Sequence, residues 1–503
     1  MNFFASIEKA ISPSPDLELL TTTENVFFSR GDILSRTAQM ANYLTELGAQ
    51  PGDRITVQVE KSVDGMCLYL ACLQAGLVFH PLNAAYLRNE IEFFLENAEP
   101  FAIVCDPEKL ETMTRLAAPL RIRHIFTLDS GGAGSFSDAR KQQSPNFPTV
   151  GRANGDLAAL LYSSGTTGTP KGIMLTHENL QSNAETLVEA WGFTDKDCLF
   201  HCLPIFHVHG LFVALGCSLL TGGTMRWAST FSPQLAKTFL PECSVMMGVP
   251  TYYTRMLSDA TFGKKNCSKL RLFTSGSAPL LVETFTEFET RTGHKILERY
   301  GMTETGMNCS NPLIGERKPG TVGPALPGVT ARIVGNDGEP TPVGQVGNLQ
   351  IRGQNVFKGY WRNPEKTEED FHDDHWFNTG DQAQVDSDGY VSIVGRSKDM
   401  VITGGLNVYP KEVEDVINFF DGVQESAVIG LPHPDFGEAV VAVVVPENGA
   451  HLEAGNVIAE TKSKLAGFKV PKYVHIISKL PRNTMGKVQK KALREGLKNL
   501  FGQ

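Results

Sequence analysis

The first half of the chain alternates between residue patterns typical of amphipathic α-helices and of β-strands. Residues 33–47 place their apolar side chains on one helical face, and Gly48 follows where a helix commonly ends. Residues 55–59 alternate as in a strand, and the alternation continues with a helix, a strand and a further short apolar run (66–75, 77–82 and 102–105). Such alternation predicts an α/β fold, with largely parallel sheets covered by helices.

The residue pattern differs in the rest of the chain. Residues 130–150, rich in Gly, Ser and Pro, predict a loop, and from about 322 to 390 short apolar runs between Gly/Pro turns predict a β-rich subdomain. Beyond the polar stretch 395–399, a helix and two strands are expected (410–420, 426–430 and 439–445). Because 503 residues exceed one ordinary core, we predict two domains. These are a large N-terminal domain of β/α-layered subdomains plus the β-rich subdomain (1–397) and a small, mobile α+β C-terminal domain (398–503).

Charge and cysteine usage exclude several classes of protein. The formal net charge of -9 argues against a dedicated nucleic-acid binder, although residues 462–503 are basic. The nine cysteines include no CxxC pair, which indicates buried free thiols in a reducing compartment. The first residues lack the pattern of a targeting signal, and the longest apolar run, 211–220, is too short to span a membrane. We therefore expect a cytoplasmic protein that binds no nucleic acid and has no membrane span. No feature indicates its oligomeric state.

The apolar run 157–162, which reads as a buried strand, leads into a segment suited to holding phosphates. From Ser163 to Gly172, ten residues contain five hydroxyls, three glycines and Lys171. Glycines let backbone N–H groups turn toward an anion, hydroxyls donate to phosphate oxygens, and the lysine adds positive charge. The segment is no Walker A loop, because Pro170 precedes the lysine and Gly172 follows it. The alternative is a polar surface loop.

A second polar cluster follows between residues 275 and 305. After the Gly/Ser turn 275–279, the stretch 298–305 contains Tyr300, whose ring can stack on a base, and Glu304, whose carboxylate can hold Mg²⁺. Each residue alone is weak evidence. Tyr300 could equally pack in the core, and Glu304 could be an ordinary surface acid.

Seven segments in this order resemble the motifs of the acyl-adenylate-forming superfamily, which includes acyl-CoA synthetases, luciferases and peptide-synthetase adenylation domains. The resemblance extends over nearly the whole chain. The segments are 163–172, 207–210, 275–279, 300–305, 379–381, 395–399 and 481–487.

The resemblance implies a role for each matching residue. The phosphate segment would hold the β- and γ-phosphates of ATP, and the 275–300 region would surround the nucleotide. Glu304 would bind Mg²⁺, and Thr303 would lie near the α-phosphate. Lys487 would bridge the substrate carboxylate and the α-phosphate, where positive charge favours the meeting of two anions; its alternative is one solvent-exposed lysine among many. The residues implied for ATP are Ser163, Ser164, Gly165, Thr166, Thr167, Gly168, Lys171, Ser277, Ala278, Arg299, Tyr300, Asp381 and Arg396.

In this superfamily a second half-reaction transfers the acyl group to the thiol of CoA. The resemblance implies that the C-terminal domain turns about Lys398 between the two steps, a hinge closure. Gly404 and Gly405 resemble the glycines that line the CoA tunnel.

The acid substrate is indicated by an arginine where relatives usually have a small residue. Arg299 precedes Tyr300, and Arg255 follows a segment that lines the acyl pocket in relatives. A buried guanidinium would be unfavourable in a fatty-acyl pocket but could bind a second carboxylate bidentately. This combination resembles the malonyl-CoA synthetases, which implies that Arg255, Ser277 and Arg299 read the distal carboxylate. The alternatives are that Arg299 pairs with Glu298 or another acid and that Arg255 lies on a helix surface.

His207 is a further candidate, expected either to line the acyl pocket or to pack in the core. The predicted reaction converts malonate, ATP and CoA to malonyl-CoA, AMP and diphosphate through malonyl-AMP, with Mg²⁺ as cofactor and methylmalonate as a second substrate. The alternatives are a short- or medium-chain acyl-CoA synthetase, an adenylation enzyme that loads a carrier protein, and a nucleotide-binding protein without activity.

Overall fold

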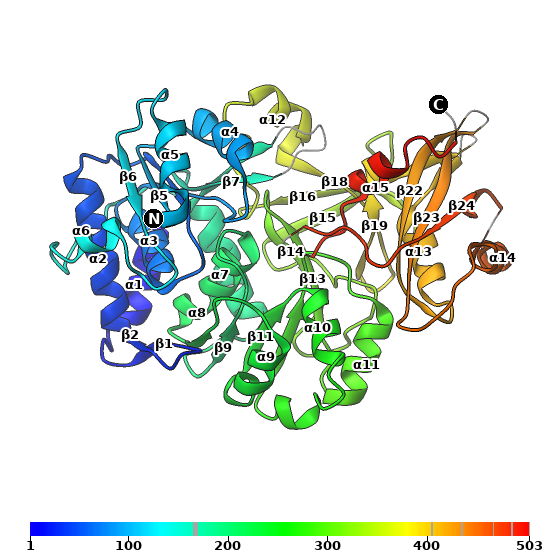
Figure 1. Ribbon diagram of the computed structural model, residues 1–503, viewed down its shortest axis with the longest axis horizontal. Helices are drawn as coiled ribbons and strands as arrows, with labels where there is room; N and C mark the ends of the chain where they lie inside the picture. The colour runs from blue at the N-terminus through cyan, green and yellow to red at the C-terminus, as the bar shows by residue number, and fades with distance from the viewer. Residues whose placement is uncertain (164–169, 404–405, 434–435, 466, 484–485, 502–503) are drawn as a thin grey trace. The chain divides into compact units, whose positions relative to one another are not determined.

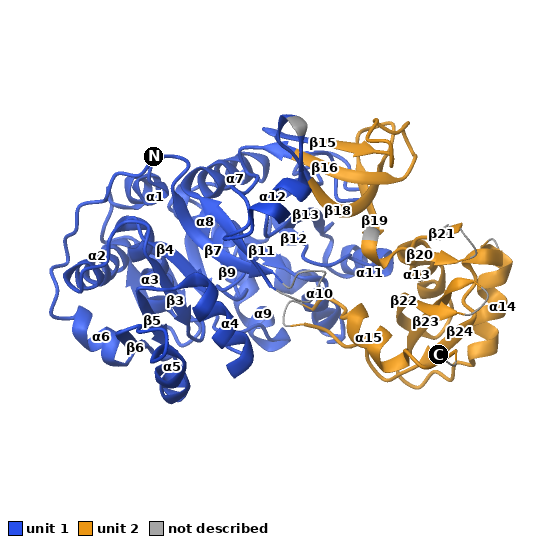
Figure 2. Ribbon diagram, turned by 90° about the horizontal axis from the view of Figure 1, so that it is seen from above, with its two compact units in different colours: residues 1–330, 352–377 blue, residues 331–351, 378–503 orange. Residues whose placement is uncertain are grey.

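The computed structural model describes residues 1–163, 170–403, 406–433, 436–465, 467–483 and 486–501. Two compact units share these residues: unit 1 contains residues 1–330 and 352–377, and unit 2 contains residues 331–351 and 378–503 (Figure 2). The predicted domain boundary after residue 397 lies within unit 2. That residues 398–503 form a separate mobile domain therefore stays a prediction.

The first sheet of unit 1 has six strands in the order β6-β5-β3-β4-β7-β8. All neighbouring pairs are parallel except β7 and β8, which flank the phosphate segment. The strands expected at 55–59, 77–82, 102–105 and 157–162 are confirmed. Thr56 and Gln58 of β3 are buried like their apolar neighbours, because both faces of this sheet are covered. The strands are β3 (Arg54–Gln58), β4 (Val78–Pro81), β5 (Ala102–Cys105), β6 (His124–Thr127), β7 (Leu157–Ser163) and β8 (Lys171–Thr176).

The expected helices around this sheet are also present, and Figure 1 shows α2 beside α3 at the N-terminal end of the chain. The helix α2 ends at Glu46, and Gly48 has the positive φ of 99° that a terminating glycine adopts. The helices are α1 (Phe3–Ile11), α2 (Arg30–Glu46), α3 (Val63–Gln74), α4 (Arg88–Ala98) and α5 (Leu110–Ala117).

The second sheet of unit 1 has eight strands in the order β14-β13-β12-β11-β9-β10-β1-β2. The six from β13 to β1 are parallel, so their carboxyl ends share one edge, the usual place for a binding site in such sheets. Its strands are β1 (Glu18–Thr22), β2 (Phe27–Ser29), β9 (Cys198–His201), β10 (Thr224–Trp227), β11 (Val245–Gly248), β12 (Leu272–Ser275), β13 (Leu297–Met302) and β14 (Gly306–Ser310).

Helices α7 and α8 pack together beside this sheet (Figure 1), and a second group packs on a core that contains Phe200, Phe273 and Phe288. The segment His209–Ala214 forms a short π-helix before α8. The helices are α7 (His177–Ala190), α8 (Leu215–Thr221), α9 (Pro233–Phe239), α10 (Pro250–Leu257) and α11 (Val282–Thr292).

The prediction of a continuous loop over 130–150 is wrong in part, because α6 (Ser135–Arg140) lies within it. The Ser137 hydroxyl and the Arg140 guanidinium both donate to the buried carboxylate of Asp64, and Phe136 packs on Tyr43. These partners are distant in sequence, so a local Gly/Ser/Pro count could not reveal the helix.

The expected β-rich subdomain is present as a third sheet, β15-β16-β18-β17 with β19 paired to β18, and the division between the units crosses its strands. It also contains a helix that the sequence did not predict, α12 (Pro364–Asp370). The strands are β15 (Val329–Val334), β16 (Gly347–Gly353), β17 (Phe371–His372), β18 (Trp376–Val385) and β19 (Val391–Arg396).

The end of unit 2 is the expected α+β fold, a sheet in the order β21-β20-β23-β22 with β24 paired to β23. Its core contains Val413 and Ile417 of the expected helix at 410–420. The elements are β20 (Val401–Thr403), β21 (Leu406–Val408), α13 (Pro410–Asn418), β22 (Val423–His433), β23 (Gly437–Pro446), α14 (Ala454–Lys464), β24 (Tyr473–Ile476) and α15 (Lys490–Leu497).

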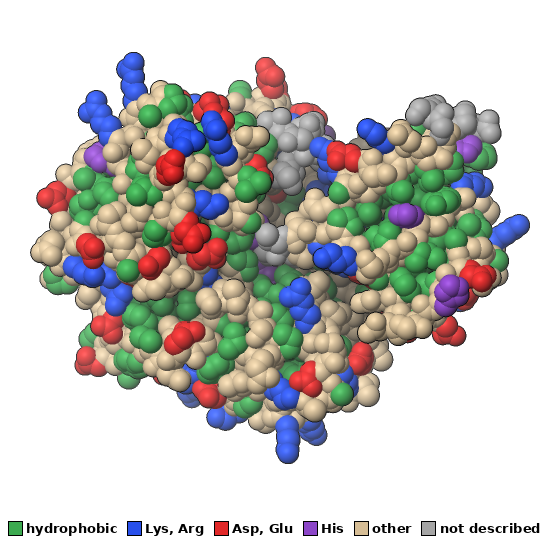
Figure 3. All heavy atoms as spheres, viewed as in Figure 1, with side chains coloured by type: hydrophobic (Ala, Val, Ile, Leu, Met, Phe, Trp, Pro, Cys, Tyr) green, Lys and Arg blue, Asp and Glu red, His purple; other side chains and the backbone are tan. Residues whose placement is uncertain are grey.

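The burial of the cysteines and the mixed charges of the surface agree with what the composition predicts. All nine cysteines are free, and all but Cys198 are buried, which confirms the expectation of buried thiols. On the face shown in Figure 3, Lys and Arg are interspersed with Asp and Glu. Among the described residues, no helix has the length and apolar character needed to cross a membrane.

Candidate active site

The motif residues of unit 1 gather at the shared edge where its parallel strands end. Strand β12 ends at Ser275, and the turn continues through Gly276 to Ser277, which adopts a positive φ of 70°. A residue other than glycine in this region is uncommon and is found where surrounding structure imposes it. The next strand, β13, contains Arg299 and Tyr300, so the two motifs lie side by side.

Arg299 is the most unusual side chain at this edge. It is only 3% exposed, and within the described part of the chain its Nε and Nη2 atoms have no hydrogen-bond partner. A Cβ at Gly276 would lie 2.7 Å from Nε and closer still to the rest of the guanidinium, so the arginine occupies space that only a glycine leaves open. Burial lowers the pKa of Arg299 to about 10, which leaves it charged at neutral pH. One Glu298 oxygen accepts from the Leu280 N–H, and none of the ion pairs described for the structure joins Glu298 to Arg299.

His209 completes this cluster, and the sequence did not single it out. Its Nδ1 lies 3.4 Å from the Ser277 hydroxyl, and Nε2 is buried with no partner among the residues described. Burial, and then the charge of Arg299, holds the pKa of His209 well below its usual range, so the ring is neutral. The signal that could have found His209 is its place in the same motif as His207.

The sequence candidate His207 lies two residues earlier and is half-buried against Phe206. Burial lowers its pKa to about 4, and none of its described contacts joins it to Ser277 or Arg299. The ring that faces the Ser277 turn is therefore that of His209. Whether His207 lines the acyl pocket or packs in the core stays a prediction.

Arg255 is not brought into this cluster by any contact that the structure describes. It lies exposed on α10, whose buried side carries Tyr253 and Met256. The Tyr253 hydroxyl donates to the Thr274 carbonyl at 2.6 Å, which fixes α10 to β12. The position of Arg255 matches the alternative reading of a helix-surface arginine, and its substrate-reading role stays a prediction.

The two ends of the phosphate segment lie near Glu304. Ser163 and Lys171 are opposite each other on β7 and β8, and the Ser163 hydroxyl lies 3.5 Å from a carboxylate oxygen of the buried Glu304. Burial, and then the charge of Lys366, lowers the pKa of Lys171, whose amine lies 4.9 Å from the centre of the Tyr360 ring. The other predicted phosphate contacts, Ser164, Gly165, Thr166, Thr167 and Gly168, lie outside the described residues.

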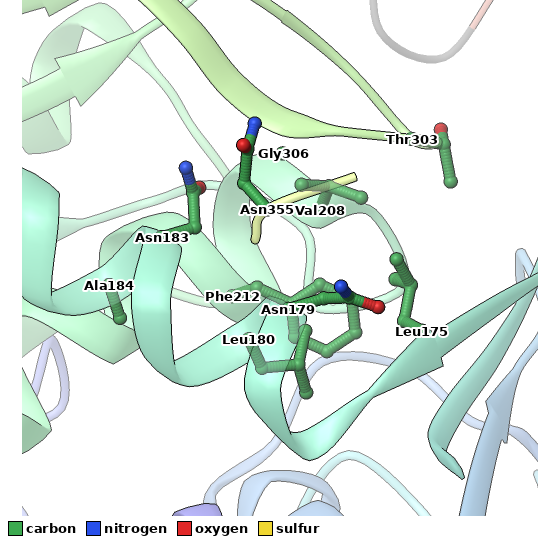
Figure 4. Close-up of a pocket in the computed structure, with 10 residues that line it drawn as sticks. All are labelled: Leu175, Asn179, Leu180, Asn183, Ala184, Val208, Phe212, Thr303, Gly306 and Asn355. Atoms are coloured by element: carbon green, nitrogen blue, oxygen red, sulfur yellow. The ribbon is translucent and has the colours of Figure 1, made fainter. Parts of the chain in front are cut away.

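The remaining nucleotide candidates of unit 1 are half-buried: Ala278 on the turn, Tyr300 on β13 and Thr303 just after it. Thr303 lines a small cavity together with Val208 and Phe212 (Figure 4), so this cavity connects the 300–305 and 207–210 motifs. Its volume of about 10 Å³ suits roughly one water molecule. It is therefore no substrate pocket as it stands.

Unit 2 contains a second group of motif residues on the β18–β19 hairpin. Asp381 and Arg396 are register partners, and Arg396 Nε donates to the Asp381 carboxylate at 2.6 Å. The Asp381 N–H donates to the Thr379 hydroxyl, which itself donates to the Leu349 carbonyl. The hinge candidate Lys398 is exposed in the short turn 397–399 that follows β19.

Lys487 is exposed, and its backbone is hydrogen-bonded to Asn483. The Asn483 side chain accepts from the Lys487 N–H at 2.9 Å, and the Asn483 N–H donates to the Lys487 carbonyl at 2.9 Å. Gly486 has a φ of 75°, and an isolated bridge joins Arg482 to Val488. The backbone at Lys487 is thus held on both sides. The predicted CoA glycines, Gly404 and Gly405, lie outside the residues that the structure describes.

The comparison with known protein families identifies the chain over most of its length. Residues 7–361 match the AMP-binding enzyme family, and residues 412–487 match the C-terminal domain of AMP-binding enzymes. The chain belongs to the AMP-binding enzyme family. This confirms the predicted superfamily and, with it, an AMP-forming acid–thiol ligase that uses ATP and CoA.

Individual proteins similar to this chain include CoA ligases for different acids. A malonate–CoA ligase of Arabidopsis thaliana is 35% identical over 485 residues, which cover 90% of this chain and 79% of that protein. A feruloyl-CoA synthase of an Amycolatopsis species is 36% identical over 92% of both chains. Among solved structures, ATP-bound MatB from Rhodopseudomonas palustris is 48% identical, covers 99% of both chains and has a TM-score of 0.97.

Few described side chains of this AMP-binding enzyme are available as magnesium ligands. Among the described residues, no group of three or more His, Cys, Asp or Glu side chains could hold a metal ion. The Glu304 carboxylate beside the Ser163 hydroxyl fits Mg²⁺, which is commonly bound by one or two carboxylates together with substrate phosphates.

Proposed function

We propose that the protein activates malonate with ATP and transfers the malonyl group to CoA, releasing AMP and diphosphate. In the first step a malonate carboxylate oxygen bonds to the α-phosphorus, and diphosphate leaves. In the second step the CoA sulfur bonds to the carbonyl carbon of malonyl-AMP, AMP leaves, and the thiol proton is released.

The buried guanidinium of Arg299 is the observation that carries this proposal. A charge taken out of water without a partner is unfavourable, and removal of one member of a buried pair costs about 3–5 kcal/mol. The described chain supplies no acceptor for Nε and Nη2, so a carboxylate of the substrate is the natural partner. The acid must therefore bring a second carboxylate in addition to the one that reacts, as malonate does.

Ser277 and His209 suit the same carboxylate. The Ser277 hydroxyl can donate one hydrogen bond, and neutral His209 has one ring nitrogen with hydrogen and one without. The two groups share one long hydrogen bond of 3.4 Å, which a carboxylate beside Arg299 could replace. A monocarboxylate with an apolar tail would leave the Arg299 guanidinium and His209 Nε2 unsatisfied.

The other motif residues supply the ATP chemistry of this proposal. Ser163 and Lys171 begin and end the segment proposed to hold the β- and γ-phosphates, and Glu304 is the proposed magnesium ligand, with Thr303 close to the α-phosphate. Ala278 and Tyr300 are proposed to flank the adenine, and Asp381 and Arg396 to hold the ribose hydroxyls. When bound, Mg²⁺ offsets the negative charge of the phosphates. Lys487 is proposed to supply positive charge where the carboxylate approaches the α-phosphate.

The second half-reaction rests on residues 398–503 as a separately moving domain. Lys398 is the proposed hinge, and Gly404 and Gly405 are proposed to admit CoA. Methylmalonate is a proposed second substrate, because one methyl group changes binding by about 1–3 kcal/mol. The cysteine pattern, nine thiols with no CxxC pair, supports a cytoplasmic location as a further proposal.

The deciding experiment is a panel of mono- and dicarboxylic acids in a CoA-dependent AMP-release assay. Malonate is expected to be used best, methylmalonate next, and butyrate and ferulate far less. A preference for butyrate, ferulate or another monoacid would overturn the malonate proposal while leaving the ligase class intact. Replacing CoA by a carrier protein in the same assay separates the two possible thiol acceptors.

A further inference from the structure

A buried lysine outside the motifs is connected by hydrogen bonds, through His201, to the 207–210 segment. Lys61, between β3 and α3, is 7% exposed. Its amine donates to His201 Nδ1 at 2.8 Å, to the His201 carbonyl at 2.8 Å and to the Ala228 carbonyl at 2.7 Å. It also lies 4.2 Å from the centre of the Trp227 ring. A protonated amine has three N–H groups, and each has an acceptor here.

These bonds fix which nitrogen of His201 has the hydrogen. A protonated lysine only donates, so His201 Nδ1 must accept, and the hydrogen of the neutral ring must be on Nε2. Nε2 lies 3.0 Å from the Gly210 carbonyl, to which it therefore donates. The ring also stacks on Trp227, with centroids 4.8 Å apart. Burial, and then the charge of Lys61, holds the pKa of His201 well below its usual range, so it stays neutral.

Gly210 follows His209 directly, and its Cα packs against the Pro204 carbonyl. A Cβ at Gly210 would collide with the Pro204 carbonyl oxygen, and the Leu211 N–H donates to the His207 carbonyl at 2.9 Å. The peptide whose carbonyl accepts from His201 is thus one residue from the ring that faces Ser277.

We propose that Lys61 and His201 are positioning residues that hold the 207–210 segment so that His209 faces Ser277 and Arg299. Lys61 sets the His201 tautomer, the His201 Nε2–H holds the Gly210 carbonyl, and this bond fixes His209. The inference rests on the proposed role of this cluster in binding the acid substrate. Neither residue contacts the Arg299 cluster itself in the described structure, so both act through Gly210.

The neutral form of Lys61 would fit this arrangement poorly. With two N–H groups on the two carbonyls, its lone pair would face the Nδ1 lone pair of His201. Burial lowers the pKa of Lys61 to about 7, with the neighbouring Cys202 raising it, and its three acceptors favour the charged form. The groups that face the amine are His201, Cys202 and the Trp227 ring.

Two substitutions at position 201 separate positioning from mere packing. In His201→Gln the amide nitrogen takes the place of Nε2 and can donate to Gly210. In His201→Asn the amide oxygen takes the place of Nδ1 and can accept from Lys61, but Gly210 loses its donor. We expect His201→Asn to raise the KM for the acid about tenfold or more, since small misplacements at a site can cost up to about a hundredfold. His201→Gln should stay within about threefold of wild type.

Lys61→Met is the companion variant, because methionine fills similar space without the charge. It should raise the acid KM as His201→Asn does, with the KM for ATP within about twofold of wild type. His177→Gln, which removes another buried histidine, is the control: it should lower the melting temperature and leave the acid KM unchanged. If Lys61→Met does not fold, the two position-201 variants still decide.

Equal acid KM values for His201→Gln and His201→Asn, or an unchanged acid KM in Lys61→Met, would overturn the positioning role. All KM values are measured with the acid that wild type uses best. A wild type that prefers a monoacid therefore refutes malonate without deciding the role of Lys61 and His201.

Discussion

The guanidinium of Arg299 and the bare backbone of Gly276 depend on each other. Arg299 lies where a side chain at position 276 would be, and it has no described acceptor for two of its nitrogens. A single Cβ atom at position 276 would displace the guanidinium. Substitutions at positions 299 and 276 therefore test the charge and its space separately.

Arg299→Gln should raise the malonate KM about 10- to 100-fold, because a hydrogen bond to a charged group contributes about 1.5–3 kcal/mol. Steady-state kinetics with malonate and with ATP measure this, and the ATP KM should change little. Arg255→Gln tests the second predicted reader: its exposed place on α10 favours a malonate KM within about twofold of wild type, whereas the predicted substrate role requires a rise. An effect as large as that of Arg299→Gln would restore Arg255 to the substrate site.

Gly276→Ala adds one methyl group where the guanidinium lies, so Arg299 must move. We expect a higher malonate KM, with malonate losing part of its advantage over butyrate. Gly151→Ala is the control, since a Cβ there meets no atom within 4 Å. Unchanged malonate selectivity in Gly276→Ala would show that the position of the guanidinium does not matter.

Among the elements, the backbone around Lys487 has the clearest task, because Asn483 binds both the N–H and the carbonyl of Lys487. Gly486→Ala places a Cβ at a φ of 75°, and Gly449→Ala does so at a φ of 84° in a turn after β23. Each should cost roughly 1–2 kcal/mol of stability.

Only Gly486→Ala should slow adenylation, by about tenfold or more, as measured by malonate-dependent ATP–diphosphate exchange. Thioester formation from supplied malonyl-AMP should be retained, because Lys487 is proposed to act in the first step. A similar loss of exchange in Gly449→Ala would assign the effect to general destabilisation of unit 2.

At the scale of the whole molecule, burial lowers the pKa of six described histidines of unit 1, His294 among them. Burial lowers the pKa of His80 to about 3 and that of His177 and His207 to about 4, and it holds those of His201 and His209 well below their usual range. Between the unfolded pKa, near 6.5, and these values, the unfolded chain binds more protons than the folded one.

Stability should therefore fall as pH drops below about 6.5, by at most about 1.4 kcal/mol per pH unit for each histidine. Urea unfolding midpoints measured between pH 4.5 and 8 test this. The double variant His80→Gln/His177→Gln should show a shallower pH dependence. A dependence equal to that of wild type would mean that other groups cause the acid sensitivity.

Much of the fold could be predicted because its signals are local. The helices at 33–47 and 410–420 repeat their apolar residues at the helical period, and the strand at 102–105 is a short unbroken apolar run. The order of the motifs also placed the chain in its family. The helix α6 escaped prediction because its support comes from Asp64, about seventy residues earlier in the chain.

The β/α alternation, the family and the arginine before Tyr300 could be read from the amino-acid order, since each depends on residue types at fixed spacing. Three features became visible in the folded chain alone: His209 faces Ser277, Arg255 is exposed, and Lys61 is buried against His201. His207 and His209 are two residues apart, yet His209, where a short π-helix begins, is buried and His207 is half-buried. Burial and hydrogen-bond partners depend on segments far away in the chain, and no local pattern records them.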